Sequence, residues 1–258
     1  MPHPLRIAMW SGPRNCSTAL MRSWENRPDT EVWDEPFYAF YLRKTGLAHP
    51  GRDEILARYE EHWPTVVGQL LQDRPPHVPA DTNAPTPAPA IYFQKQMAHH
   101  LFPDQGRDWW PHLTHCFLIR EPRAMLLSLE VKLTRFELWE TGLPQQVELF
   151  RAVRDSQTEP PPVIDSRDLL GNPRGTLAQL CSVLDVPFHD GMLSWPPGPR
   201  DSDGSWGKHW YDRVHQSTGF APYLDKTGDL PPHLAAMEEQ CLPLYEELHS
   251  HRLTAAEE

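Results

Sequence analysis

The sequence has few cysteines, and no two of them have the spacing of a metal or redox site. The 258 residues contain no Cys-x-x-Cys motif, and the four cysteines are Cys16, Cys116, Cys181 and Cys241. We therefore expect neither a disulfide framework nor a thiolate zinc site. His112 and His115 have a spacing found in metal sites, but no carboxylate or thiol partner is evident, so we expect no bound metal.

The chain also lacks long apolar runs and a positive net charge. No stretch approaches the length of a membrane span, and the first residues do not resemble a signal peptide. The formal net charge of −11 argues against a long positive surface for nucleic acid. We expect one large cytoplasmic domain over residues 1–258, without a membrane or nucleic-acid partner. A homodimer is compatible with this sequence.

A third absence is the Gly-x-x-x-x-Gly-Lys-[Ser/Thr] motif, so a standard P-loop kinase or ATPase is not supported. A related pattern occurs near the amino terminus. An apolar run, 7–10, breaks at Gly12 and Pro13, and helical spacing resumes at Ser17. Such a turn aims backbone N–H groups and a helix N-terminus at one point, which favours an anion. Arg14 adds a positive charge. An ordinary strand-to-helix connection, in which Ser17 caps the helix N-terminus and no anion binds, would give the same pattern.

Short strands alternate with helices along the chain. Apolar runs predict strands at 5–10, 31–33, 91–94, 114–120 and 162–165. Helical spacing predicts helices at 17–26, 34–46, 52–72, from 121 onward, 144–157, 173–184 and 231–249. This order predicts an α/β fold in three layers, with helices on both sides of a mainly parallel five-stranded sheet. The Pro/Ala-rich residues 73–90 are interpreted as a mobile or extended surface loop within the single domain.

Polar residues gather where the predicted strands end. The carboxyl ends of parallel strands share one edge of a sheet, and ligands bind there. The residues that follow four of these strands are Arg14, Asp34, Glu35, Lys95, His99, His100 and Arg120, with Ser128 two helical turns beyond the last. Two arginines, a lysine and nearby hydroxyls suit a ligand with more than one phosphate-like group. Ordinary polarity at strand ends is the alternative interpretation.

Three stretches resemble motifs of the sulfotransferases. Residues 11–18, Ser-Gly-Pro-Arg-Asn-Cys-Ser-Thr, are similar to the 5′-phosphosulfate loop of that family. Residues 117–128 resemble its 3′-phosphate motif, an Arg-x-Pro at a strand end with a serine on the next helix. Residues 198–208 resemble its late glycine-rich loop, which folds over the nucleotide. The resemblance implies a P-loop-type α/β fold that uses 3′-phosphoadenosine-5′-phosphosulfate (PAPS) without a metal. Its sulfuryl group would pass to a hydroxyl or amine of a small molecule or carbohydrate.

The resemblance also implies roles for individual residues. Glu35 is the first choice for the general base that deprotonates the acceptor, and His99 and His100 are the rivals. Arg14 would meet the charge on the leaving phosphate, and Lys95 would contact the transferred sulfonate. The residues expected to bind the donor are Arg14, Asn15, Cys16, Ser17, Thr18, Arg120, Ser128, Arg200 and Lys208.

The phosphosulfate loop departs from the family pattern at Asn15 and Cys16, where small residues are usual, and Arg14 stands where many members have lysine. Arg14 and a helix start favour a lowered pKa and a redox-sensitive Cys16 thiol, but inert packing is the interpretation we prefer. Two other functions therefore stay open. One is a divergent P-loop phosphotransferase, and the other is a nucleotide-binding protein of the same fold without catalysis.

Overall fold

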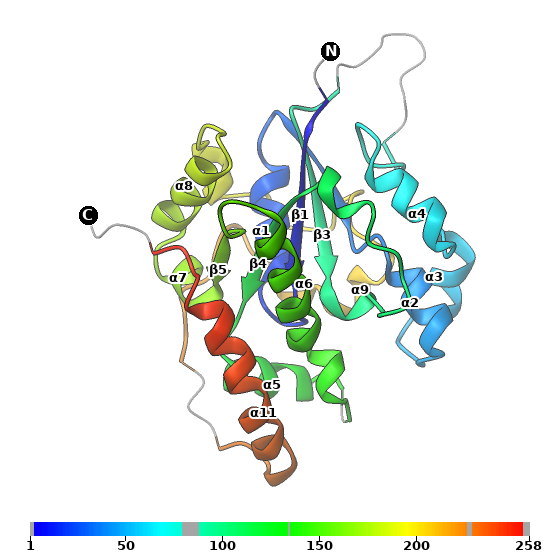
Figure 1. Ribbon diagram of the computed structural model, residues 1–258, viewed down its shortest axis with the longest axis vertical. Helices are drawn as coiled ribbons and strands as arrows, with labels where there is room; N and C mark the ends of the chain where they lie inside the picture. Colours follow the sequence, from blue (N-terminus) through cyan, green and yellow to red (C-terminus); the bar gives the residue numbers. More distant parts are fainter. Residues whose placement is uncertain (1–2, 79–87, 134, 226–228, 255–258) are drawn as a thin grey trace.

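In the computed structural model, five parallel strands form one central sheet (Figure 1). The structure describes residues 3–78, 88–133, 135–225 and 229–254. The strands lie in the order β2-β3-β1-β4-β5. Their bounds are Leu5–Ser11 (β1), Thr30–Asp34 (β2), Ile91–Met97 (β3), Thr114–Ile119 (β4) and Val163–Asp165 (β5). Every pairing is parallel, so the carboxyl ends meet at one edge. The predicted α/β fold is confirmed.

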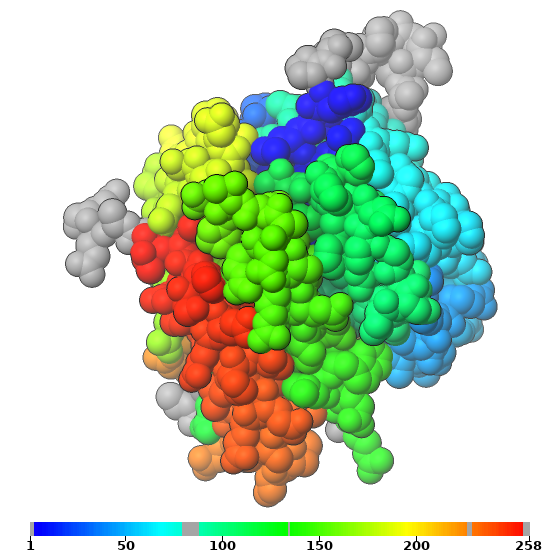
Figure 2. Space-filling model, in the orientation of Figure 1, coloured from blue at the N-terminus to red at the C-terminus, as the bar shows by residue number. Residues whose placement is uncertain are grey.

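Helices cover both faces of this sheet. The α-helices of the described residues are α1 (Ser17–Glu25), α2 (Tyr38–Thr45), α3 (Arg52–Arg58), α4 (Trp63–Leu70), α5 (Pro122–Glu130), α6 (Leu143–Ser156), α7 (Ser166–Gly171), α8 (Pro173–Val183), α9 (Gly207–Trp210), α10 (Asp212–His215) and α11 (Pro232–His249). Two 3₁₀ turns matter for the site, η1 (Ala98–His100) and η3 (Leu138–Thr141). Helix α11 packs beside α6 and α5 on one face (Figures 1 and 2).

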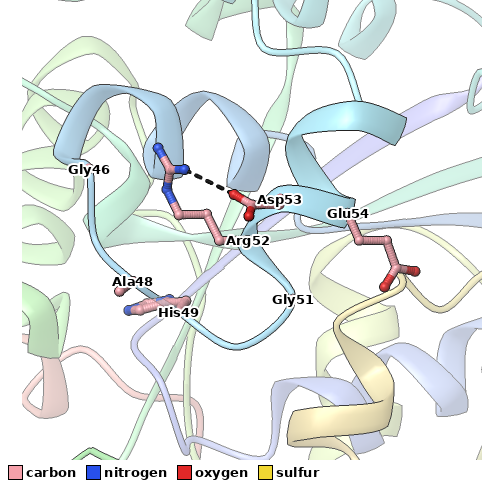
Figure 3. A pocket seen from close by; sticks show the side chains of 7 residues that line it. All are labelled: Gly46, Ala48, His49, Gly51, Arg52, Asp53 and Glu54. Atoms are coloured by element: carbon pink, nitrogen blue, oxygen red, sulfur yellow. Dashed lines mark hydrogen bonds and ion pairs between the residues drawn. The ribbon is translucent and has the colours of Figure 1, made fainter.

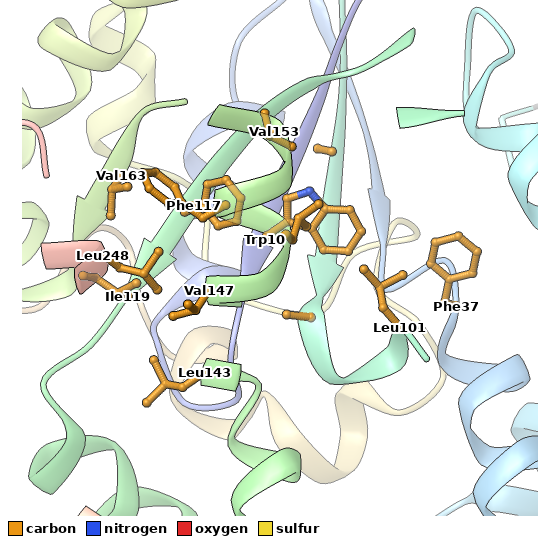
Figure 4. Packing of buried hydrophobic residues seen from close by; sticks show 14 of the residues in the cluster. Trp10, Phe37, Leu101, Phe117, Ile119, Leu143, Val147, Val153, Val163 and Leu248 are labelled. Carbon is orange, nitrogen blue, oxygen red and sulfur yellow. The ribbon is translucent and has the colours of Figure 1, made fainter. Parts of the chain in front are cut away.

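Alternation along β1 builds one core on each face of the sheet. Ala8 and Trp10 belong to the cluster under α5, α6 and α11, which Figure 4 shows around Trp10 and Phe117. Ile7 and Met9 belong to the opposite cluster, under α1 and α8. All four β1 side chains are fully buried. Because successive strand residues face opposite sides, this apolar run fits only a strand that is covered on both faces.

Three predicted boundaries were wrong. The predicted helix at 52–72 is two helices, because the backbone is extended at Tyr59. Pro64 lies in the first turn of α4, and it has no N–H that could continue a helix from the preceding residues. The helix predicted from 34 starts at Tyr38, since Glu35 has a φ of 42°. Strand β3 continues to Met97, so Lys95 lies inside a strand. Of the predicted loop at 73–90, residues 79–87 lie outside the described residues.

Residues 198–215, here called the late segment, cross the carboxyl edge of the sheet. The backbone N–H of Gly204 donates to Asp34 Oδ2 at 3.2 Å, which ties this segment to β2. Lys132 donates to Asp212 at 3.0 Å and ties it to the end of α5. Figure 1 shows α9 beside the carboxyl end of β3 and near α2. Chain distant in sequence therefore covers the edge where we expect the ligand.

Candidate functional site

The loop between β1 and α1 turns sharply at two residues other than glycine. Arg14 has a φ of 65° and Cys16 a φ of 58°, which side-chain-bearing residues rarely adopt. Two contacts anchor the loop, one to β4 and one to the start of α7. Asn15 Nδ2 donates to the Leu118 carbonyl at 3.2 Å, and the Ser166 hydroxyl lies 3.0 Å from the Asn15 carbonyl. The loop is thus held in a strained conformation at the start of α1, as often occurs at functional sites.

The Cys16 side chain is half-buried at this turn. It packs against the core cluster under α1 and α8. Burial raises the pKa of the thiol to about 11, and a hydrogen bond with Ser166 opposes this only in part. The thiol is therefore protonated at neutral pH, which contradicts a reactive Cys16 and agrees with inert packing.

Gly12 lies where two segments of backbone cross. A Cβ atom at this position would lie 2.2 Å from the carbonyl oxygen of Thr141 in η3. Gly142, which follows Thr141, has a φ of 74°, and a Cβ added to it would lie 3.1 Å from Gly12 Cα. Only glycine fits at this crossing. Turn η3, which precedes α6, therefore packs directly against the start of the phosphosulfate-like loop.

Arg14, Arg120 and Ser128 come together beside this loop, as predicted. Arg14 Nε donates to the Ser128 hydroxyl at 3.1 Å, and Arg120 donates to the Arg14 carbonyl at 2.6 Å. Arg120 Nε is buried without a hydrogen-bond partner among the described residues. Burial, and then the charges of Arg120 and Arg213, lower the pKa of the Arg14 guanidinium. Like charges are therefore crowded here, which favours an anion between them.

Arg213 was missed by the sequence reasoning. It lies in α10 of the late segment, and its charge acts on Arg14. The predicted late-loop cations face elsewhere: Arg200 pairs with Glu25 at 2.8 Å, and Lys208 pairs with Glu54 at 2.5 Å. The structure does not bring these two together with Arg14. The sequence shows basic residues within and shortly after the glycine-rich stretch. That pattern alone does not indicate which of Arg200, Lys208 and Arg213 faces Arg14.

A second cluster joins Glu35 and Lys95, from adjacent strands. The Lys95 ammonium donates to Glu35 Oε1 at 2.5 Å, to Asp34 Oδ1 at 2.8 Å and to the Tyr211 hydroxyl at 2.8 Å. Burial would lower the pKa of Lys95, but the two carboxylates raise it, so the ammonium stays charged. Burial raises the pKa of Glu35 more than the Lys95 charge lowers it. A buried carboxylate with a raised pKa suits proton abstraction near neutral pH.

These elements match a known family. A family model described as a sulfotransferase domain matches residues 5–251. The chain belongs to the sulfotransferase family. A solved sulfotransferase from Alicyclobacillus acidocaldarius has the same fold, with a TM-score of 0.51 and 14% identity over 98% of each chain.

Two relatives of this sulfotransferase chain occur in Arabidopsis thaliana, under the names branched-chain-amino-acid aminotransferase-like protein 2 and protein 1. Both are 35% identical to it, over 95% and 97% of its length. The chain spans 41% and 43% of the length of these relatives. Their names therefore describe proteins more than twice as long as the region compared.

His99 and His100, the other candidate bases of this sulfotransferase chain, lie in η1 and pack against aromatic rings. The His100 ring stacks on Tyr38, and His99 meets Tyr41 edge to face. Burial lowers the pKa of His99 to about 3 and that of His100 well below its ordinary value. Both Nδ1 atoms are buried without partners among the described residues. Both imidazoles are therefore neutral and weakly basic.

A hollow of about 620 Å³ lies beside α2 and α3 (Figure 3). Its lining residues are Gly46, Ala48, His49, Gly51, Arg52, Asp53 and Glu54, and it includes none of the predicted donor-binding residues.

In the described ranges, no three His, Cys, Asp or Glu side chains are placed to hold a metal ion. No described helix has the length and apolar character needed to cross a membrane.

Proposed function

We propose that the chain transfers the sulfuryl group of PAPS to a hydroxyl or amine of a small molecule or carbohydrate. The observation that supports this most is the crowding of Arg14, Arg120 and Arg213 around one loop. The charges of two neighbouring arginines act on Arg14, and Asp212, the nearby acid that opposes them, is itself paired with Lys132. Such a site is stabilised by a ligand with several negative charges.

The residues present fit PAPS at both of its charged ends. The N–H groups of the loop and the start of α1, with Arg14, would hold the 5′-phosphosulfate. Arg120, whose Nε has no partner among the described residues, would hold the 3′-phosphate together with Ser128 and Arg213. When bound, PAPS supplies an activated sulfuryl group attached to a phosphate leaving group. Arg14 would stabilise the negative charge that develops on that phosphate.

Glu35 is the proposed general base, and Lys95 its partner. Glu35 accepts from Lys95 in a buried cluster, so its carboxylate is fixed in one orientation. It would take the proton of the acceptor hydroxyl or amine. The predicted contact of Lys95 with the transferred sulfonate is not supported, because its three N–H groups are already directed at Asp34, Glu35 and Tyr211. His99 and His100 are less suitable, because burial lowers the pKa of His99 to about 3. Glu35 is favoured as the base because Lys95 holds its carboxylate in place and because its pKa is raised.

Binding of 3′-phosphoadenosine-5′-phosphate tests the donor site directly. We expect saturable binding at micromolar ligand in isothermal titration calorimetry, and about 10- to 100-fold weaker binding by Arg120→Ala, since a hydrogen bond to a charged group contributes roughly 1.5–3 kcal/mol. Arg123→Ala is the matched control, because Arg123 lies in the first turn of α5 and pairs with Glu238 of α11. If the wild type shows no saturable binding, the proposed donor is wrong. If Arg120→Ala binds as well as Arg123→Ala, the site assignment is wrong.

Transfer of labelled sulfonate from PAPS to acceptors in a cell extract tests the base. We expect Glu35→Gln to lower the rate by about 10²- to 10⁴-fold, as for other general bases, while it still binds the nucleotide. Glu31→Gln is the control on the same strand, since Glu31 pairs with Arg74 instead. An active Glu35→Gln variant, combined with loss of activity in His99→Ala or His100→Ala, would transfer the role to the histidine pair. Nucleotide binding without any transfer by the wild type would favour the non-catalytic alternative.

A further inference from the structure

Tyr211 links the late segment to the two carboxylates at the carboxyl end of β2. The residue is buried between α9 and α10, and its hydroxyl lies 2.8 Å from Asp34 Oδ2 and 3.3 Å from Glu35 Oε1. The Lys95 ammonium lies 2.8 Å from the same hydroxyl, and Trp206 Nε1 lies 3.0 Å from it. Four polar groups from three parts of the chain thus converge on one oxygen.

The direction of these hydrogen bonds follows from counting protons. Lys95 and Trp206 can only donate, so the Tyr211 oxygen accepts from both. A phenol has one proton of its own, and the remaining neighbours, Asp34 and Glu35, are carboxylates. The Tyr211 proton is therefore directed at the carboxylate pair. Asp34 is the nearer acceptor, with its two oxygens 2.8 and 3.0 Å from the hydroxyl, and Glu35 Oε1 lies 3.3 Å away. A donor held in this way stabilises the ionised form of the pair.

Packing keeps the Tyr211 ring in place. A Cβ on Gly207 would lie 3.0 Å from the ring, so the start of α9 packs tightly against it. The Lys95 ammonium lies 5.1 Å from the centre of the same ring. Gly204 lets the Trp206 ring lie flat against the backbone, where a Cβ would come within 2.1 Å of it. The hydroxyl is thus positioned by rigid surroundings, as a supporting residue of a catalytic group must be.

We propose that Tyr211 is a positioning residue for the base, whose hydroxyl holds Glu35 ionised and correctly oriented for proton abstraction. This inference rests on the proposed function, because it requires Glu35 to be the base. It adds a residue that none of the recognised motifs contains. It also means that the base at the end of β2 is completed by a side chain from the far part of the chain.

The ionisable groups that face Glu35 are Asp34 of β2, Lys95 of β3, Tyr211 of the late segment, and Tyr38 and Tyr41 of α2. Burial and the Asp34 charge raise the pKa of Glu35, whereas Lys95 and the Tyr211 hydroxyl lower it. Removing the hydroxyl therefore raises that pKa further. A base must be ionised, so activity in the variant should be lost at a higher pH as the solution is acidified.

Tyr211→Phe is the direct test, because it removes one oxygen and keeps the ring. With PAPS and the acceptors of a cell extract, we expect the ratio of the transfer rate at pH 6 to that at pH 9 to fall by up to about tenfold, since a hydrogen bond to a charged group contributes roughly that factor or more. Affinity for 3′-phosphoadenosine-5′-phosphate should stay within about twofold. Tyr59→Phe is the matched control. Its hydroxyl accepts from the N–H of Ser205 in the same late segment but does not belong to the carboxylate cluster.

Trp206→Phe provides a second variant if Tyr211→Phe does not fold. It removes the indole donor that directs the Tyr211 hydroxyl, so the same pH ratio should fall by a smaller factor. A pH ratio in Tyr211→Phe or Trp206→Phe equal to that of Tyr59→Phe would overturn the inference, even if the wild type is active and Glu35→Gln is not. A wild type that transfers no sulfonate, or an active Glu35→Gln variant, would instead overturn the proposed function, and with it this inference.

Discussion

At the scale of single residues, strain and anchoring explain the loop at Arg14 and Cys16. Each left-handed, non-glycine residue costs of order 1 kcal/mol or more. The loop keeps this conformation because Asn15 and Ser166 fix its backbone to β4 and the start of α7. In this conformation Cys16 packs against the core cluster under α1 and α8, and burial raises the pKa of its thiol.

Residues on regular elements could be predicted from the sequence, and those on the late segment could not. Arg14, Arg120 and Ser128 follow strand ends or helix positions, so their meeting was predictable from the order of the elements. Arg213 lies in the four-residue helix α10, and Tyr211 is the single residue between α9 and α10. Where such a segment docks depends on contacts such as that of Gly204 with Asp34, which no periodicity encodes. The position of Arg200 and Lys208 was unpredictable for the same reason.

At the scale of elements, the fit between η3 and the loop after β1 depends on Gly12. We expect Gly12→Ala to lower the free energy of unfolding by about 3 kcal/mol, because its Cβ would lie 2.2 Å from a backbone oxygen that cannot move aside cheaply. Urea denaturation measures this change. We also expect weaker binding of 3′-phosphoadenosine-5′-phosphate, since the displaced backbone belongs to the proposed donor site.

Gly68→Ala is the control for this substitution. Gly68 lies within α4, and an added Cβ would meet nothing within 4 Å. Alanine has a higher helix propensity, so this variant should gain about 0.5–1 kcal/mol and bind the nucleotide unchanged. If Gly12→Ala were as stable as the wild type, the close crossing at Thr141 would not exist in solution.

The sheet was predictable as an element because its strands are covered on both faces. Continuous apolar runs such as 7–10 and 116–119 have few other solutions in a chain that alternates strands with helices. The break between α3 and α4 was missed, although Pro64 marks it, because apolar spacing continues across both helices. Local backbone geometry, here the extended Tyr59, overrides a periodic pattern.

At the scale of the whole molecule, buried neutral histidines should make the fold sensitive to acid. His115 in β4 accepts from Trp10 Nε1 at 2.9 Å, and its other nitrogen lies 3.0 Å from the Trp110 carbonyl. The ring is therefore neutral, with Nδ1 as acceptor and Nε2 as donor. Burial lowers the pKa of His115 to about 4 in the folded protein. The unfolded chain takes up this proton near pH 6.5.

This difference in pKa has a defined sign. Above pH 6.5 neither state binds the proton, and the full stability is present. Between pH 6.5 and 4 only the unfolded state binds it, so the free energy of unfolding falls by up to about 3 kcal/mol from His115 alone. We expect His115→Gln, which can still accept from Trp10, to remove this part of the decline between pH 7 and pH 4. Exposed His112, three residues away, is the control, and His112→Gln should decline like the wild type. Urea denaturation across this pH range measures the slopes. If His115→Gln and the wild type lose stability in parallel, the ring is not held neutral in the fold.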